Sequence, residues 1–225
     1  MISRQKIAVI VAGGSGQRMG SATPKQFLSL AGKPVLYHTI AAFKAAYDDM
    51  HIILVVPEAH KTQIAHVLTA FDRPPSVTLV DGGETRFHSV RNGLQVIRGE
   101  AVVFVHDGVR PLVSPSLIRT CHEEALVQGS AVPAIELKDS IREVDDEGNM
   151  AADRSRFRII QTPQTFLSEL LIPAFEQPYE PLFTDEATVV ERMGHDIHLV
   201  QGEEQNIKIT RPADLAIAAA FLAGQ

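Results

Sequence analysis

The sequence is poor in cysteine, has no excess of positive charge and contains no long hydrophobic run. Cys121 is the only cysteine in the 225 residues, so an intrachain disulfide is excluded and a reducing compartment is expected. The net charge of −6 argues against broad binding to nucleic acid or anionic membranes, although a local basic pocket is compatible with it. Together these absences predict a soluble, cytoplasmic protein.

Two short apolar segments could be mistaken for export or membrane signals. The run IAVIV near the start leads directly into glycines, which favours a buried strand over a signal peptide. The stretch LAIAAAFLAG near the other end is too short to span a bilayer. With 45% hydrophobic and 21% charged residues, the composition is that of a globular protein, and the length predicts a single domain over residues 1–225.

Short apolar runs alternate with amphipathic stretches along the chain. The runs KIAVIVAGG, HIILVVPEA, SVTLVDGG and AVVFVHDG are typical of strands buried on both faces. Helical spacing marks KPVLYHTIAAFKAAYD, EAHKTQIAHVLTAF and RFHSVRNGLQVIRG between them. This alternation predicts an α/β fold with helices on both faces of a mainly parallel sheet. Ligands of such folds bind beyond the carboxyl ends of the strands, where the glycine-rich loop and Asp107 fall.

The stretch AGGSGQRMGSATPKQF, residues 12–27, follows the first predicted strand. It is not a P-loop, because no lysine stands at the required place, and it is not the dinucleotide fingerprint, because Met19 replaces the third glycine. Its glycines still let backbone N–H groups approach an anion, and Arg18 and Lys25 add a planar and a compact cation. A nucleoside triphosphate needs this kind of charge compensation, although both cations could equally be solvated surface residues.

A polar segment, AIELKDSIREVDDEGNMAADRSRFRII, interrupts the alternation. The turn signal DDEGN predicts a β-hairpin. The segment has too few apolar residues to bury itself, so the hairpin should pack against another surface. A partner subunit and a surface flap explain the pattern equally well. No internal repeat or low-complexity tract accompanies it.

Several blocks of the sequence together resemble one family. AGGSGQRMG with PKQF is similar to the signature of pyrophosphorylase-type nucleotidyltransferases. GGETRFHSV, VHDGVRP, DRSRFRIIQTPQTF, FTDEA and NIKITRPADL follow in the order of the 2-C-methyl-D-erythritol 4-phosphate cytidylyltransferases, with similar separations. The resemblance covers nearly the whole chain. It implies a Rossmann-like fold of the nucleotide-diphospho-sugar transferase type, with a protruding β-hairpin arm at about residues 134–157 that joins a homodimer.

The reaction implied by the resemblance joins CTP and a sugar-alcohol phosphate, with pyrophosphate as the second product and Mg²⁺ as the metal. The attacking phosphate arrives largely deprotonated, since its second pKa is about 6, so no general base is needed. Repulsion between the two anions is the main obstacle, and fixed cations remove it. The catalytic residues implied are Arg18 and Lys25 for the triphosphate, and Arg154 and Lys208 for the acceptor phosphate.

The same resemblance implies which residues bind the substrates. It assigns the nucleotide to Ala12, Gly13, Gly14, Ser15, Gly16, Gly83, Glu84, Ser89 and Gly108. It assigns the acceptor to Asp107, Arg110, Ser140, Thr162 and Thr184, and the metal ion to Asp107; Arg110 would either face the acceptor or brace the loop. Ser140 and Arg154 would complete the site of the neighbouring subunit; Ser140 stands where threonine is expected and keeps the hydroxyl.

Helix capping offers simpler roles for two of these residues. Ser89 could cap a helix that begins at Val90. Thr184 could cap the helix DEATVVERM, which carries acids in its first turn. Both alternatives stay open at the level of the sequence.

Asp107 and Lys208 also have simpler alternatives. Asp107 could be a turn residue at the end of its strand, and a solvent-facing Lys208 would show the same alternation with Ile207 and Ile209 on the opposite face of a strand. His106 is expected to pack or to form hydrogen bonds rather than to catalyse. None of the nine histidines belongs to a convincing set of metal ligands.

Rival functions share parts of the pattern. A ribitol-5-phosphate cytidylyltransferase has the same loop, HD and NIK blocks, and only DRS before TPQ favours the methylerythritol acceptor. The GGETRFHSV block and the arm argue against a sugar-1-phosphate or molybdenum-cofactor nucleotidyltransferase. The failed fingerprint disfavours a dinucleotide-dependent oxidoreductase. A nucleotide-binding module without activity would be expected to lose one of the four cations, and all four are present.

Overall fold

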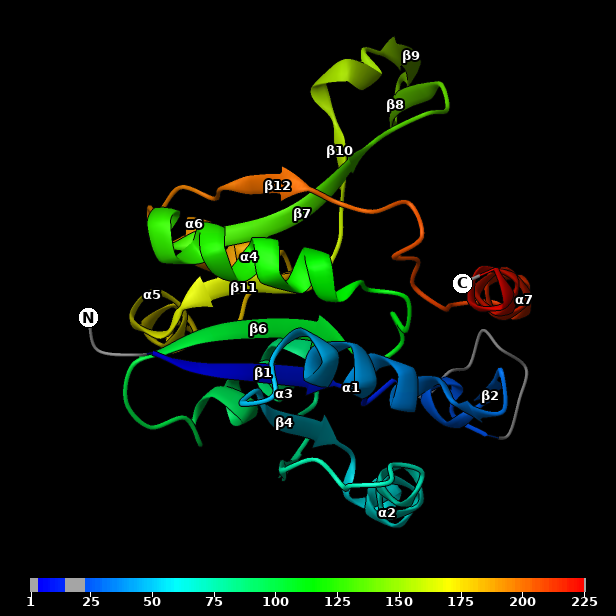
Figure 1. Cartoon of the computed structure of the whole chain (residues 1–225). Helices are drawn as coiled ribbons and strands as arrows, with labels where there is room; N and C mark the ends of the chain where they lie inside the picture. Colours follow the sequence, from blue (N-terminus) through cyan, green and yellow to red (C-terminus); the bar gives the residue numbers. More distant parts are fainter. Residues whose placement is uncertain (1–3, 15–22, 225) are drawn as a thin grey trace.

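Figure 1 shows a central sheet flanked by helices, in a computed structural model that describes residues 4–14 and 23–224. The strands are β1 (Gln5–Val11), β2 (Ser29–Leu30), β3 (Lys33–Pro34), β4 (His51–Val56), β5 (Val77–Asp81), β6 (Ala101–Asp107), β7 (Ser130–Glu136), β8 (Ile141–Asp145), β9 (Gly148–Ala152), β10 (Arg158–Ile160), β11 (Gln164–Leu167) and β12 (Leu199–Gln201). The α-helices are α1 (Val35–Ala46), α2 (Lys61–Thr69), α3 (Arg86–Leu94), α4 (Pro115–Gln128), α5 (Ser168–Ala174), α6 (Glu186–Glu191) and α7 (Pro212–Ala223). Among the described residues, the short 3-10 helices are η2 (Lys25–Phe27), η3 (Glu58–His60) and η4 (Arg154–Arg156).

The central sheet has eight strands in the order β10-β7-β11-β6-β1-β4-β5, with β12 also paired to β7. β1 lies between β6 and β4, and both pairs are parallel, as is the pair of β4 with β5. β11 runs antiparallel to β6, and β7 antiparallel to β11. The predicted α/β fold with a mainly parallel sheet is therefore confirmed, and antiparallel strands extend it on one side only.

Apolar side chains alternate between the two faces of the sheet, and helices cover both. On one face α1, α2 and α4 pack on the sheet through residues that include Phe43, Ile64 and Cys121. On the other face α3, α5 and α6 contribute residues that include Phe87 and Leu171. Two layers of helices thus exclude water from strands that are apolar on both sides.

Strand β5 departs from its predicted burial. SVTLVDGG predicts a strand buried on both faces, but no residue of β5 is fully buried, and Leu79 is 39% exposed. The reason is position: β5 is the last strand of the sheet and has only β4 as a neighbour. Apolar composition predicts a strand but cannot tell an edge strand from a central one.

The carboxyl ends of β1, β4, β5 and β6 lie along one edge of the sheet. Val11 at the end of β1 is opposite Asp107 on one side and Val55 on the other, and Val56 is opposite Asp81. The loops that follow these strands therefore gather in one region. This edge is the predicted place for a ligand.

Helix α7 carries the apolar sequence near the end of the chain. It has 12 residues and contributes Ala218 and Leu215 to a small third cluster, together with Leu30 and Ile209. Nowhere in residues 4–14 and 23–224 is there a helix with the length and apolarity needed to cross a membrane.

The predicted hairpin is present and forms an arm that extends away from the central sheet (Figure 1). β8 and β9 pair with each other, from Ile141 opposite Ala152 to Asp145 opposite Gly148. The turn is held by Asp145, whose Oδ1 accepts hydrogen bonds from the N–H groups of Glu147 and Gly148, both at 2.9 Å. Most of its side chains are exposed, as expected for a ribbon that cannot bury itself.

Candidate active site

A cavity of about 320 Å³ lies at the carboxyl edge of the sheet. Its walls come from the segments that follow β1, β4, β5 and β6, and from η2 and the chain around residue 208. The lining residues are Val11, Ala12, Gly13, Gly14, Lys25, Gln26, Pro57, Gly82, Gly83, Glu84, Thr85, Arg86, Ser89, Asp107, Val109 and Lys208. The structure thus brings together residues predicted from separate blocks of the sequence.

The turn before α3 forms one wall and requires glycine. A Cβ on Gly83 would lie 2.4 Å from the Cβ of His88, which is far closer than two carbon atoms can approach. The Gly83 N–H donates to Ser89 Oγ at 3.0 Å, and the Ser89 hydroxyl donates to the Thr85 carbonyl at 3.0 Å. The capping alternative for Ser89 is wrong, because α3 begins at Arg86 and its N-cap is Thr85.

Lys25 reaches the glycine loop from the short helix η2. This helix is fixed to the end of β1 by the buried side chain of Gln26, which donates to the Ala12 carbonyl at 2.8 Å. A Cβ on Gly14 would lie 3.6 Å from Lys25 Cε, so the lysine stem packs along the glycine backbone. Of the other positions predicted here, Ser15, Gly16 and Arg18 lie outside the described residues.

Asp107 is surrounded by three cations. Its Oδ2 lies 2.9 Å from Lys208 Nζ and 3.5 Å from Arg110 Nε, and its Oδ1 lies 3.4 Å from Arg86 Nε. The Asp107 side chain is only 10% exposed. Burial alone would raise the pKa of this carboxyl, but the charges of Arg86, Lys208 and Arg110 hold it well below its ordinary value. Asp107 is therefore ionised and fixes the three cations around itself.

Lys208 reaches Asp107 from an extended segment rather than from a strand. The predicted strand over NIKIT is wrong, because residues 206–210 form no ladder with another strand. The predicted alternation does hold: Ile209 is buried and its N–H donates to the Val109 carbonyl at 2.9 Å, while Lys208 lies on the cavity side. Lys208 is 41% exposed, so it is partly open to solvent as well as paired.

Arg110 supports this cluster from outside the cavity. Besides Asp107 it binds the carbonyl of Asn206, to which its Nη1 donates at 2.7 Å. Its side chain is only 12% exposed. Arg110 therefore joins the loop after β6 to the segment that carries Lys208. Gly108 beside it packs tightly, since a Cβ there would lie 3.0 Å from Ala12 Cβ.

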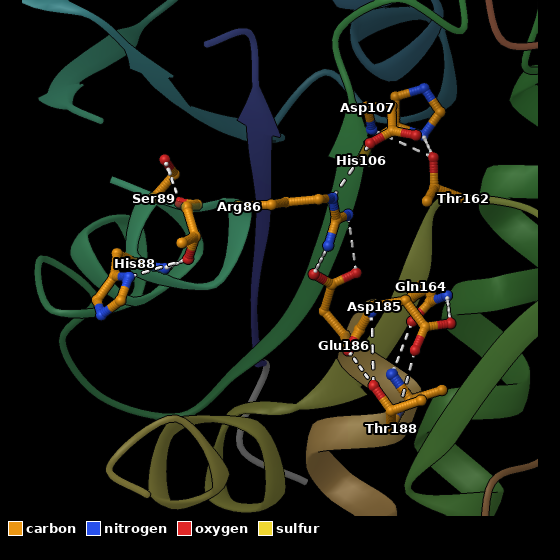
Figure 2. A network of polar contacts seen from close by, with 12 residues as sticks. Arg86, His88, Ser89, His106, Asp107, Thr162, Gln164, Asp185, Glu186 and Thr188 are labelled. Carbon is orange, nitrogen blue, oxygen red and sulfur yellow. Dashed lines mark hydrogen bonds and ion pairs between the residues drawn. The ribbon is translucent and has the colours of Figure 1, made fainter. Parts of the chain in front are cut away.

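His106 and Thr162 form a buried hydrogen-bonded chain behind Asp107 (Figure 2). His106 Nε2 donates to the Arg110 carbonyl at 3.2 Å, so Nδ1 accepts from the Thr162 hydroxyl at 3.0 Å. Thr162 Oγ1 in turn accepts from the Asp107 N–H at 3.2 Å. Burial lowers the pKa of His106 to about 4, which keeps the ring neutral, as this chain requires. The packing and bonding role expected for His106 is confirmed, and Thr162 braces the site from inside.

Arg86 and Glu186 belong to the site but did not stand out from the sequence. Figure 2 shows the Arg86 guanidinium between Asp107 and Glu186. Its Nη2 donates to Glu186 Oε2 at 3.0 Å, and its Nη1 donates to Oε1. The signal that could have revealed Arg86 is its place in GGETRFHSV, directly after the cap of α3 at the sheet edge. Glu186 carried no such signal, because only the fold shows that it is fully buried.

Three predicted acceptor residues lie apart from this cavity. Arg154 lines a second cavity of about 630 Å³ at the base of the arm, together with Lys138 and Arg158. Ser140 and Thr184 are exposed and line neither cavity. The capping alternative for Thr184 is off by one residue, because Asp185 caps α6. Within one chain, Lys25, Asp107 and Lys208 are thus brought together, whereas Arg154 is not.

The donor set fits a divalent metal ion only together with a phosphate ligand. No group of three or more His, Cys, Asp or Glu side chains that could hold a metal occurs in the described part of the chain. The Asp107 carboxylate offers about four lone-pair sites, and three cations occupy its surroundings. One remaining site suits Mg²⁺, which in proteins takes one or two carboxylates and completes its shell with water and phosphate oxygens.

A glycine-lined cavity at the carboxyl edge of a mainly parallel sheet, with cations organised around a buried carboxylate, defines a Rossmann-like α/β protein of the nucleotidyltransferase class. The particular family follows from comparison with known families. Residues 6–224 match the model of 2-C-methyl-D-erythritol 4-phosphate cytidylyltransferase (IspD), and the chain belongs to this family.

Curated relatives and solved structures agree with this assignment. The chain is 45% identical over 217 residues to the 2-C-methyl-D-erythritol 4-phosphate cytidylyltransferase of Bacteroides fragilis, covering 96% of this chain and 99% of that one. It is 46% identical over 222 residues to that of Porphyromonas gingivalis, covering 98% and 99%. A crystal structure of 4-diphosphocytidyl-2C-methyl-D-erythritol synthase from Anaerococcus prevotii matches with a TM-score of 0.83 at 27% identity, covering 98% and 99% of the two chains.

Proposed function

We propose that the chain transfers CMP from CTP to 2-C-methyl-D-erythritol 4-phosphate, releasing pyrophosphate, in the synthesis of isoprenoid precursors. The observation that carries this proposal is the group of cations on Asp107 at one end of a glycine-lined cavity. Membership of the cytidylyltransferase family, over residues 6–224, supports CTP as the nucleotide and 2-C-methyl-D-erythritol 4-phosphate as the acceptor.

In the proposed reaction an oxygen of the acceptor phosphate attacks the α-phosphorus of CTP. A new P–O bond forms, the bond between the α-phosphorus and the bridging oxygen breaks, and pyrophosphate leaves with that electron pair. The attacking group is already an anion, so no side chain has to remove a proton. The protein must instead neutralise charge and align the two phosphates. A cavity whose lining carries Lys25, Arg86 and Lys208 suits this demand.

Each cation has a proposed place in this scheme. Lys25, beside the glycine loop, would hold the triphosphate together with Arg18, which lies outside the described residues. Lys208 would bind the acceptor phosphate while Asp107 holds its ammonium group. Asp107 would also be the protein ligand of Mg²⁺, which supplies further positive charge to the triphosphate when bound.

The nucleotide is proposed to enter between the glycine loop and the turn before α3. Ala12, Gly13, Gly14, Gly83, Glu84 and Ser89 all line this part of the cavity. Pro57 closes it near Gly13, where a Cβ would lie 3.8 Å from the proline Cδ. A narrow pocket with backbone walls would accept a pyrimidine and exclude the larger purines.

The arm is proposed to join a homodimer and to complete the acceptor site of its neighbour. Arg154 is at the base of the arm, away from Lys208 of the same chain, so a second subunit would have to supply it. Exposed apolar side chains support a covered surface: Val144 is 75% and Met150 62% exposed. We further propose that residues 1–225 form one nucleotidyltransferase domain with this arm at about 134–157. The single, buried thiol of Cys121 suits the cytoplasm.

One assay tests the proposed reaction. The protein is incubated with CTP, Mg²⁺ and either 2-C-methyl-D-erythritol 4-phosphate or ribitol 5-phosphate, and pyrophosphate is followed. Release with the first acceptor alone is expected. Pyrophosphate release with ribitol 5-phosphate alone would show that ribitol 5-phosphate is the acceptor. Pyrophosphate release with neither acceptor would indicate a nucleotide-binding module without activity.

Mixed dimers test the sharing of sites. Arg154→Ala and Lys25→Ala subunits are each expected to lose about 10² in turnover or more, as for other fixed charges at a transition state. If the arm completes the neighbouring site, a dimer with one subunit of each kind regains one intact site and part of the activity. Verified mixed dimers without any regained activity would contradict the arrangement.

A further inference from the structure

The Arg86–Glu186 pair lies beside the cavity and has no part in the proposed charge scheme. Glu186 is fully buried, and the two forked nitrogens of Arg86 bind its carboxylate. The remaining nitrogen, Nε, faces Asp107 Oδ1 at 3.4 Å. Two carboxylates therefore use three of the five N–H donors of the guanidinium. Burial lowers the pKa of Arg86, but Glu186 and Asp107 raise it above its ordinary value, so the residue is a permanent cation.

Glu186 is held in place by the start of α6 (Figure 2). Asp185 and Thr188 form a capping box at this helix end. Gln164 of β11 fixes the same turn from the sheet side, because its Nε2 donates to Asp185 Oδ2 at 2.9 Å and its Oε1 accepts from the Ala187 N–H at 2.8 Å. The carboxylate of Glu186 therefore has a fixed position. Through it, the position of the Arg86 fork is fixed as well.

Arg86 is the only one of the three cations around Asp107 that contacts Oδ1; Lys208 and Arg110 both contact Oδ2. Rotation of the carboxylate about its Cβ–Cγ bond would exchange the two oxygens. The Arg86 contact on Oδ1 opposes this rotation and so keeps Oδ2 directed at Lys208.

We propose that Arg86 is a positioning residue for cytidylyl transfer: anchored by Glu186, it sets the orientation of Asp107 and, through Asp107, the place of the Lys208 ammonium group. This inference rests on the proposed function, in which Lys208 binds the acceptor phosphate. It gives the fully buried Glu186 a role, since an ionised side chain is rarely buried without a paired partner. Neither residue has to touch the reacting atoms.

A direct contact of Arg86 with CTP is the competing explanation, because Arg86 also lines the cavity. The two explanations differ in what they require of Glu186, which is fully buried and is not a lining residue. If Arg86 acts by direct contact, its charge matters and Glu186→Gln leaves turnover nearly unchanged. If Arg86 acts by position, Glu186→Gln lowers turnover as much as a substitution that removes the guanidinium of Arg86.

The test is a double-mutant cycle with Arg86→Lys, Glu186→Gln and the double variant. For each we expect kcat to fall about tenfold to a hundredfold, because small misplacements of a reacting group have effects of this size. We expect KM for the acceptor to rise and KM for CTP to stay within about threefold. The double variant is expected to be no worse than the more affected single variant, since both changes break one unit.

Two further comparisons separate positioning from stability and from general damage. The variant Arg86→Met/Glu186→Leu replaces the buried pair by apolar side chains, a change that often leaves stability unaltered. We expect this variant to unfold at the same temperature as the wild type and to keep a reduced kcat. Arg192→Lys and Glu180→Gln alter a surface pair at 3.1 Å and serve as matched controls with normal kinetics.

The outcomes distinguish the inference from the function on which it rests. A wild-type protein without pyrophosphate release would overturn the proposed function. An active wild type with a normal Glu186→Gln variant, or with additive effects in the cycle, would overturn the positioning role and leave the function intact. A folded Arg86→Met/Glu186→Leu variant with wild-type kcat would do the same.

Discussion

Replacing Lys208 by methionine removes one charge from the site and little else. The methionine keeps most of the stem, while the ammonium group 2.9 Å from Asp107 Oδ2 is lost. Asp107 keeps its contacts with Arg86 at 3.4 Å and with Arg110 at 3.5 Å, so it stays ionised. We therefore expect Lys208→Met to fold with nearly unchanged stability and to bind the acceptor phosphate more weakly.

The size of the effect follows from charge, distance and exposure. Two unit charges about 4 Å apart near a protein surface attract by about 4 kcal/mol. Because Lys208 is 41% exposed, solvent screening roughly halves this figure. About 2 kcal/mol corresponds to a loss of roughly 30-fold in kcat/KM for the acceptor. The affinity for CTP, which Lys25 and the glycine loop are proposed to hold, should change little.

The assay is steady-state pyrophosphate release at saturating CTP with the acceptor concentration varied. Lys61→Met is the matched control, because Lys61 Nζ lies 2.8 Å from Asp81 Oδ1 and the side chain is 40% exposed, but it does not line the cavity. This control should keep wild-type kinetics. If Lys208→Met and Lys61→Met have the same kcat/KM for the acceptor, the reasoning about Lys208 is refuted.

Three smaller predictions concern Cys121, the N-cap of α6 and the turn before α3. Burial raises the pKa of Cys121 from 9.0 to about 12, so at pH 8 its thiolate population is about a thousandfold lower and a thiol reagent should modify it only after unfolding. Asp185→Ala removes the N-cap of α6 and should lower the free energy of unfolding by about 1 kcal/mol in denaturant titrations. Gly83→Ala forces a Cβ to within 2.4 Å of His88 Cβ, so it should lower stability by about 1–3 kcal/mol and raise KM for CTP.

Each of these has a clear contrary result. Modification of Cys121 in the native protein at the rate of a free thiol would show that it is not buried in solution. An Asp185→Ala variant as stable as the wild type would mean that the second partner of α6, Gln164, holds the helix end alone. A Gly83→Ala variant with normal KM for CTP would show that the turn before α3 does not contribute to nucleotide binding.

Much of the fold could be predicted from local patterns. Strands β1, β4 and β6 follow apolar runs, and α1, α2 and α3 follow helical spacing, because burial of one face is a periodic property of the sequence. The location of the site at the carboxyl edge followed from strand–helix alternation alone. Two details were predicted wrongly: β5 is an edge strand, which only the assembled sheet shows, and the cap of α3 is Thr85, whose hydroxyl accepts from the His88 N–H, rather than Ser89.

Local patterns in the chain were enough to predict most of the elements, the edge at which they form a site, and the cations available to that site. Which charges meet depends on the packed fold, because pairing joins residues far apart in the chain, as with Arg86 and Glu186, which are 100 positions apart. A carboxylate such as Glu186 or Asp107 carries the same charge in any sequence. Burial beside an oppositely charged partner changes the free energy of the ionised carboxylate by several kcal/mol. Burial is a property of the packed fold.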